Sequence, residues 1–241
     1  MPKRFLFLFA FSFLLGSCGG GGDDGGSSEA ASPPAQTLTV PLTTAMAALA
    51  ANGITANFSI SGSVENKPVS GSGTLNAAPA DSATLNSAVV LKTTETVTGT
   101  VITNGNSEPF SGTRFIFRNS ATFAVVAIDQ GADGYAAFAD YTFPATVKAG
   151  DSGPLATATI FSDNTQAAKL GSLTQSFSVA PDSGTTLLVT FLNTEFDNSN
   201  ARVGEEETTF RIDTSGNISF VSSKFTFFGA NGQPVSTLIF Q

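Results

Sequence analysis

Apolar and polar residues alternate with a period of two along most of the chain from residue 54 onward. Phe58, Ile60 and Val64, for example, alternate with serines and an asparagine. Such alternation predicts strands that place one face on a core. Clusters of turn-forming residues separate these segments, at 104–106, 129–134, 148–154, 182–184, 197–200, 213–217 and 231–232. About a dozen strands at this spacing predict an all-β fold, either a large antiparallel sandwich or an open or closed barrel.

One short helix is predicted before the strands, over residues 41–52. Its apolar side chains fall on one helical face, namely Leu42, Met46, Leu49 and Ala50. Thr43 or Thr44 can cap the N-terminus, and Asn52 followed by Gly53 favours an end there. We expect this helix to cover one end of the sheet.

Phenylalanine supplies most of the aromatic content, with 22 Phe against two Tyr and no Trp. Because the phenyl ring has no polar group, we expect most of these side chains in the core. Alternation in the segment 114–118 places Phe115 and Phe117 on one face and Arg114 and Arg118 on the other.

Charged residues make up only 12% of the chain, and the formal net charge is −8. The basic residues are scattered, which argues against a nucleic-acid partner because phosphate binding needs clustered Lys and Arg. There is no His, and a single Cys rules out an intrachain disulfide. The chain therefore lacks the commonest general base and metal ligand, and we expect a protein without enzymatic activity or cofactor.

The first residues have the layout of a secretion signal. Two basic residues, Lys3 and Arg4, precede an apolar stretch at 5–15 that is too short to span a bilayer. The stretch ends in the tetrad Leu15-Gly16-Ser17-Cys18. Residues 1–17 are therefore predicted to be a signal peptide.

The tetrad LGSC resembles the lipobox of bacterial lipoproteins. This resemblance implies cleavage between Ser17 and Cys18, diacylglycerol on the Cys18 thiol, and a further fatty acid such as palmitate on the new N-terminus. Two or three acyl chains give stable membrane attachment. Because residue 19 is Gly rather than Asp, the sorting rule of the family implies the outer membrane, either at its periplasmic face or at the cell surface.

The rest of the chain divides into a tether and one domain. Residues 18–36 comprise the lipidated Cys and a stretch of mainly Gly, Asp, Ser, Ala and Pro that is too polar and flexible to fold. Residues 37–241 are predicted to form a single β-rich domain. This layout resembles the uncharacterised glycine-linker β-rich lipoproteins of Gram-negative proteobacteria, and the resemblance implies no particular activity.

One acidic cluster is a candidate metal site. Asp129, Asp133 and Asp140 occupy the first, fifth and twelfth positions of a calcium-loop pattern, but Gly131 stands where an oxygen ligand is needed. The flanking segments also have strand rather than helix character. A hairpin turn is therefore the favoured interpretation, and no metal site is assigned.

A second cluster is the run Glu205-Glu206-Glu207. Paired carboxylates can hydrolyse glycosides when they stand apart in a cleft. Consecutive strand residues instead point to opposite faces, with Glu205 and Glu207 side by side. We interpret the run as a charged, solvated strand edge that discourages edge pairing.

Three function classes fit these observations. The favoured one is a non-catalytic, membrane-anchored lipoprotein of the bacterial envelope that acts as a structural or protein-interaction module of unknown partner. The second is a carrier or binder of an apolar ligand in a Phe-lined β cavity. The third is a membrane-embedded barrel, suggested by the apolar C-terminal segment 238–241 but weakened by the lack of Tyr and Trp girdles.

Overall fold

The computed structural model describes residues 38–241, so the predicted signal peptide, the cleavage site at Ser17 and Cys18, and the tether lie outside the described residues. The elements of the described part, in chain order, are β1 (Thr39–Val40), α1 (Leu42–Asn52), β2 (Ile54–Val64), β3 (Lys67–Ala77), β4 (Asp81–Leu85), β5 (Ala88–Thr103), β6 (Asn106–Asn119), β7 (Val125–Asp129), a 3-10 turn (Gly131–Asp133), β8 (Tyr135–Phe138), β9 (Val147–Lys148), β10 (Ser152–Phe161), β11 (Lys169–Pro181), β12 (Thr186–Asp197), β13 (Arg202–Asp213), β14 (Ile218–Phe228) and β15 (Pro234–Phe240).

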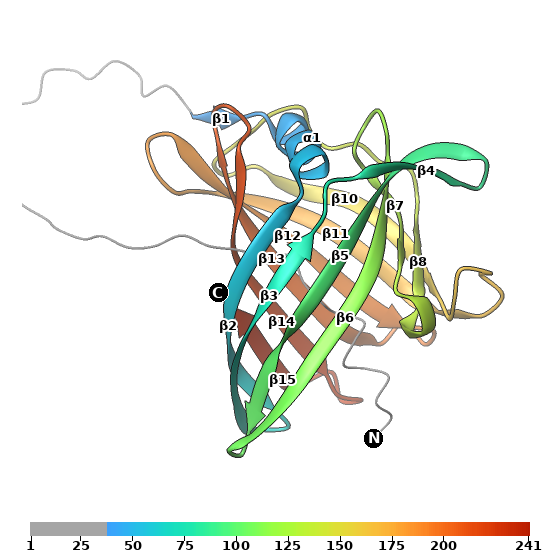
Figure 1. Ribbon diagram of the computed structural model, residues 1–241, viewed down its shortest axis with the longest axis vertical. Coiled ribbons are helices and arrows are strands. Elements are labelled where there is room, and N and C mark those ends of the chain that lie inside the picture. The colour runs from blue at the N-terminus through green and yellow to red at the C-terminus, as the bar shows by residue number, and fades with distance from the viewer. Residues whose placement is uncertain (1–37) are drawn as a thin grey trace, which may run out of the picture.

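Twelve of these strands form a closed antiparallel barrel, which confirms the predicted all-β class and selects the closed barrel among its alternatives (Figure 1). Neighbours in the barrel mostly follow chain order, and the last strand, β15, pairs with β2. The ladder between β3 and β5 closes the ring, with Ala77 opposite Glu95 at one end. β4 pairs with the part of β5 beyond that ladder, so β3 and β4 follow the same strand on either side of a break at 78–80.

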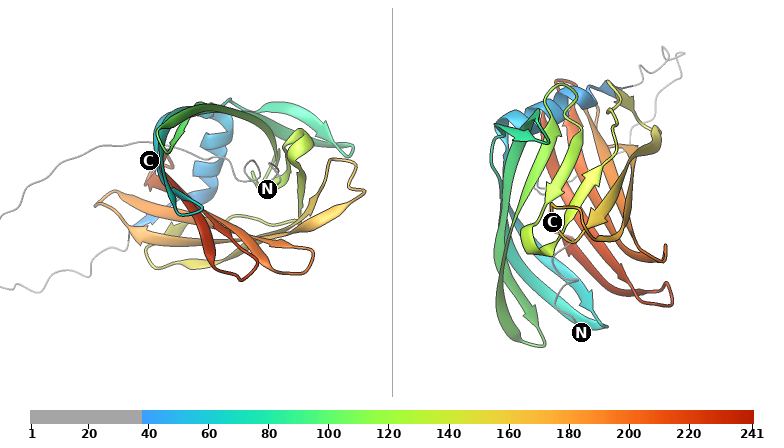
Figure 2. Two further views of the ribbon diagram at one scale, coloured as in Figure 1. Left: turned by 90° about the horizontal axis from the view of Figure 1, so that it is seen from below. Right: turned by 90° about the vertical axis from the view of Figure 1, so that its right-hand side faces the viewer.

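The predicted helix is confirmed as α1, which lies across one end of the barrel (Figure 2). Leu42, Ala45 and Met46 are buried in the main hydrophobic core. The threonine cap is wrong, because the helix begins at Leu42 and both threonines already lie in its first turn. The Thr43 hydroxyl instead donates to the Pro144 carbonyl oxygen at 3.2 Å, which ties α1 to the segment between β8 and β9.

Aromatic rings on the inner face pack edge to face, the arrangement that phenyl rings prefer. The Phe210 ring centroid lies 6.0 Å from that of Phe191 and 5.9 Å from that of Phe220. A second group joins Phe240 to Phe225 at 5.2 Å and to Phe58 at 5.6 Å. These buried rings confirm the expected Phe core along much of the barrel.

The predicted alternation over 114–118 is confirmed on β6, but its two phenylalanines are exceptions to the Phe core. Phe115 and Phe117 lie on the outer face, and Arg114 and Arg118 lie on the inner face. The two rings lie near a cation instead of in the core, since the Lys92 ammonium is 3.7 Å from the Phe115 ring centroid and 5.9 Å from that of Phe117.

Much of the remaining outer face is polar. On β2 and β3 the outward positions carry hydroxyl and amide side chains, namely Thr55, Asn57, Ser59, Ser61, Ser63, Ser70, Ser72, Thr74 and Asn76. Two cross-strand hydrogen bonds join this layer, from Thr55 to Asn76 and from Thr74 to Asn57, both at 2.9 Å. The outward positions of these two strands therefore do not form a continuous apolar band.

Two glycines on the inner face leave room for aromatic rings. The Phe58 ring lies against Gly73, and the Phe110 ring lies against Gly99. A Cβ at position 99 would stand 2.6 Å from Cζ of Phe110 and 2.5 Å from the Ser72 carbonyl oxygen. Neither approach is possible without moving the ring or the wall.

We therefore expect Gly99→Ala to lower the free energy of unfolding by about 1–3 kcal/mol, as overpacked cores do. Urea denaturation measures this change. Gly184→Ala is the matched control, because a Cβ there meets nothing within 4 Å, and it should change the stability by no more than about 0.5 kcal/mol. Equal stabilities of the two variants would contradict the proposed ring packing.

Candidate functional site

On neighbouring strands, the inward positions change from apolar to polar partway along the barrel. We call this group the polar belt, and its members are Thr93, Glu95, Arg114, Arg118, Gln175, Asn193, Glu195, Glu206, Thr208 and Ser223. The strand register brings its members together in two groups, one on β5 and β6, where Glu95 stands opposite Arg114, and one on β11 to β14, where Asn193 stands opposite Glu206. Ionisable groups are rarely buried unless they are paired, so the belt is an unusual feature of the core.

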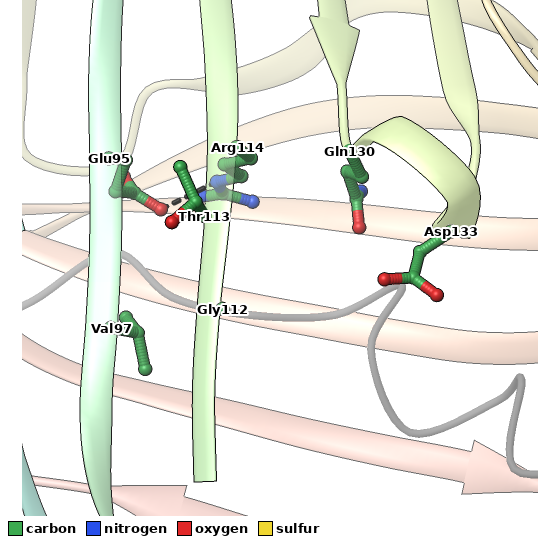
Figure 3. A pocket seen from close by; sticks show the side chains of 7 residues that line it. All are labelled: Glu95, Val97, Gly112, Thr113, Arg114, Gln130 and Asp133. Atoms are coloured by element: carbon green, nitrogen blue, oxygen red, sulfur yellow. Dashed lines mark ion pairs between the residues drawn. The ribbon is translucent and has the colours of Figure 1, made fainter.

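Glu95 and Arg114 form the ion pair of the belt (Figure 3). Their closest atoms are 2.5 Å apart, and their side chains are 5% and 11% exposed. Burial raises the pKa of Glu95 to about 7 despite the opposing charge of Arg114. Burial lowers the pKa of Arg114, but the charges of Glu95 and Glu206 more than compensate and the pKa is raised. Arg114 therefore has a carboxylate partner that opposes the cost of burying its charge.

Arg118 is also buried but is not compensated. Its exposed fraction is 7%. Among residues 38–241, no carboxylate lies within ion-pair distance of its guanidinium, and its Nε finds no hydrogen-bond acceptor. Burial lowers the pKa of Arg118 below its ordinary value. Electrostatic interactions with Tyr141 and Glu95 act in the opposite direction but do not outweigh burial.

A hydrogen-bond chain crosses the opposite wall of the belt. The Gln175 amide donates to Asn193 Oδ1 at 2.9 Å, and Asn193 Nδ2 donates to Glu206 Oε2 at 3.3 Å. The Thr208 hydroxyl lies 3.2 Å from Glu206 Oε1 and 2.8 Å from Ser223 Oγ. The chain leaves Gln175 Oε1 as a buried acceptor with no donor in the described part of the protein.

Glu195 lies next to this chain and has a different protonation state from an ordinary carboxylate. Burial raises its pKa to about 8. The side chain therefore holds a proton at neutral pH and contributes a donor to the lumen rather than a negative charge.

Cavities run along the polar belt. One of about 110 Å³ lies between α1 and the belt, with Arg118, Tyr141 and Gln175 in its wall. A second, of about 70 Å³, is lined by Glu195 and Ala136. Both cavities share a boundary formed by Arg114, Val125, Ile128, Gln175, Asn193 and Glu206. The lumen is thus a divided space with charged and apolar walls.

A smaller cavity of about 30 Å³ lies at an interruption of the barrel wall (Figure 3). β6 pairs with β7 only from Phe115 to Arg118, so over 106–114 the described strands give it a single neighbour, β5. Gln130 and Asp133 at the β7–β8 turn face this stretch, beside the Glu95–Arg114 pair.

The candidate calcium loop does not form a cluster. Asp129 ends β7, where its Oδ1 accepts a hydrogen bond from the Gly131 amide at 2.8 Å. Asp133 lies in the 3-10 turn, and Asp140 follows β8. Within residues 38–241, no group of three or more Asp, Glu, Cys or His side chains is arranged to hold a metal ion.

The interpretation of Glu205–Glu207 as a strand edge is wrong, because β13 is paired on both sides, with β12 and with β14. Glu205 and Glu207 lie outside, where Glu205 pairs with Arg202 at 2.8 Å. Glu206 is buried in the lumen. Its position follows from alternation with Phe210 and Ile212 on the same strand.

Position parity is the sequence signal that could have found the belt. Asn193 and Glu195 continue the inward series of Leu187, Val189 and Phe191. Glu95 likewise shares its parity with Val97. A charged residue that interrupts an apolar series on one strand face therefore marks a buried polar site.

Comparisons of the chain with protein-family models, with curated proteins and with solved structures find no match. In the described part of the chain, no helix combines the length and hydrophobicity needed to cross a bilayer. The chemistry of the belt is therefore the basis for a functional assignment.

The raised pKa of Glu195 predicts a pH-dependent stability. Between the ordinary value of 4.5 and about 8, the folded state holds the proton more tightly than the unfolded state. The unfolding free energy should therefore fall as pH rises through this window, by up to about 1.4 kcal/mol per pH unit. In Glu195→Gln this part of the fall should be absent, so the variant gains stability over the wild type as pH rises.

Urea denaturation at several pH values between about 5 and 8 measures the difference. Glu207→Gln is the control, since its side chain is 48% exposed and it should keep the wild-type slope. A Glu195→Gln slope equal to that of the wild type would contradict the protonated state of Glu195.

Proposed function

We propose that the protein is a non-catalytic, lipid-anchored binding protein of the bacterial envelope whose barrel holds a small molecule. The observation that supports this most directly is the set of cavities along the polar belt, which contain buried polar groups without partners in the described chain. Buried polar groups are normally satisfied, and a ligand is one way to satisfy them.

The belt changes the kind of ligand that the lumen suits. The sequence suggested an apolar ligand in a Phe-lined cavity, but the cavity walls combine Phe191 and Phe210 with Arg118 and Glu206. A small molecule with both polar and apolar parts complements such a wall better than a hydrocarbon does. The structural or protein-interaction role inferred from the sequence remains a prediction.

Lipid anchoring at Cys18 belongs to the same proposal. The outer wall of β2 and β3 carries Ser, Thr and Asn side chains, which suits a barrel surrounded by water. A barrel that crosses a bilayer instead presents an apolar band to lipid. Acyl chains on Cys18 would hold such a water-exposed domain at the outer membrane through the tether.

Replacing Cys18 by Ser should prevent acylation and processing. We expect Cys18→Ser to accumulate as a precursor that still contains residues 1–17 and takes up no labelled palmitate. Intact-mass measurement and metabolic labelling in a Gram-negative host test this. Normal maturation of the variant would contradict the anchor and leave the binding role of the barrel unaffected.

Filling the lumen should displace the proposed ligand. Val125 on β7 lines both cavities, whereas the next residue, Val126, lines neither of them. Native mass spectrometry of the full chain, extracted from the envelope in mild detergent, should show a bound small molecule in the wild type and in Val126→Phe. The signal should be lost in Val125→Phe. A wild type free of any bound molecule would contradict the binding role.

A further inference from the structure

The guanidinium of Arg118 is the strongest indication of what the lumen binds. A buried charge without a partner is costly, because desolvation is not repaid by an opposite charge. Arg114, four residues earlier on the same strand, has that compensation from Glu95, while Arg118 has no carboxylate within ion-pair distance among the described residues. An anionic group in the adjoining cavity of about 110 Å³ would supply it. A carboxylate suits best, since its two oxygens match the fork of the guanidinium.

Tyr141 provides a second donor in the same cavity wall. Its hydroxyl oxygen accepts a hydrogen bond from the Val125 amide at 3.0 Å. This bond uses the oxygen lone pair and leaves the O–H free to donate. Arg118 and Tyr141 together therefore form a donor pair for an anion. Charge-assisted hydrogen bonds of this type are stronger than neutral ones.

Gln175 indicates a second group that the ligand must carry, a hydrogen-bond donor. The Glu206 carboxylate accepts from Asn193 Nδ2, so Asn193 presents Oδ1 to Gln175 and the Gln175 amide nitrogen must donate to it. This order fixes Gln175 Oε1 as the atom without a donor. A ligand that reaches Oε1 must therefore carry an N–H or O–H group.

The cavity volume limits the size of the ligand. A cavity of about 150 Å³ accepts a molecule the size of benzene, so the 110 Å³ cavity suits a molecule of at most roughly six non-hydrogen atoms. Met46, Phe191 and Phe210 complete the wall and can contact a short carbon chain.

We propose that this cavity binds a small organic carboxylate that carries one hydrogen-bond donor, with Arg118 and Tyr141 holding the carboxylate and Gln175 accepting from the donor. The inference rests on the proposed binding function and names its ligand class. A short hydroxy acid has the required groups.

Three probes of similar size, lactate, propionate and lactamide, distinguish the contact to the carboxylate from the contact to the hydrogen-bond donor. Isothermal titration calorimetry on the full lipoprotein in detergent should show lactate binding tightest. Propionate lacks the donor and should bind about 5- to 10-fold more weakly, the value of one neutral hydrogen bond. Lactamide lacks the charge and should bind roughly 10- to 100-fold more weakly. Equal affinities for the three probes, or no lactate binding, would overturn the inference.

Variants assign the contacts to residues. Arg118→Met should weaken lactate binding roughly 10- to 100-fold, while its melting temperature without ligand stays equal to or above that of the wild type because an unpaired buried charge is removed. Gln175→Met should abolish the preference for lactate over propionate. Arg202→Met is the control, since this arginine lies on the outer face with 43% of its side chain exposed, and it should keep wild-type affinity.

One comparison separates this inference from the proposed function. Arg118→Met should lose the molecule detected by native mass spectrometry in the wild type, as Val125→Phe does. If Arg118→Met retains a molecule that Val125→Phe loses, the barrel binds a ligand but Arg118 does not recognise it. That result would overturn the carboxylate inference and leave the binding function in place.

Discussion

Closure of the sheet through the β3–β5 ladder is the constraint on which the rest of the molecule depends. In a closed ring every strand must direct alternate side chains inward, so those partway along the barrel are enclosed by the other strands. The same alternation that buries Phe210 and Phe220 also encloses Glu206 and Arg118. The strand register thus determines that the polar belt lies inside the barrel. Its charged groups must therefore be paired with other groups inside the lumen.

The individual elements could be predicted from local pattern, because alternation and turn formation depend on residues that are adjacent in the sequence. Turns that contain glycine, such as those at 104–106 and 213–217, were recognisable from the sequence. The turns at Glu65–Asn66 and Asn86–Ser87 were not, although all four residues have positive φ, because neither contains the glycine that usually marks such a turn. The choice of barrel over sandwich depends on pairing between strands distant in sequence, which no local window specifies.

The site could be predicted only in part, for a related reason. Alternation places Arg114 and Arg118 on one face and Phe115 and Phe117 on the other, but it does not decide which face points inward. Lys92, on the neighbouring strand, makes the outward placement of those rings tolerable. Gln175 and Glu206 are distant in sequence from β6, so their approach to the arginines follows from the ring and not from any motif.

The pairing of β15 with β2 also determines when the molecule can become complete. β15 lies between the first and the penultimate strands of the ring, and Gln241 exchanges backbone hydrogen bonds with Ser59. Until β15 is in place, the sheet has two open edges, at β2 and β14, and no enclosed interior. Closure of the ring therefore depends on contacts of long sequence separation, and we expect it to be slow.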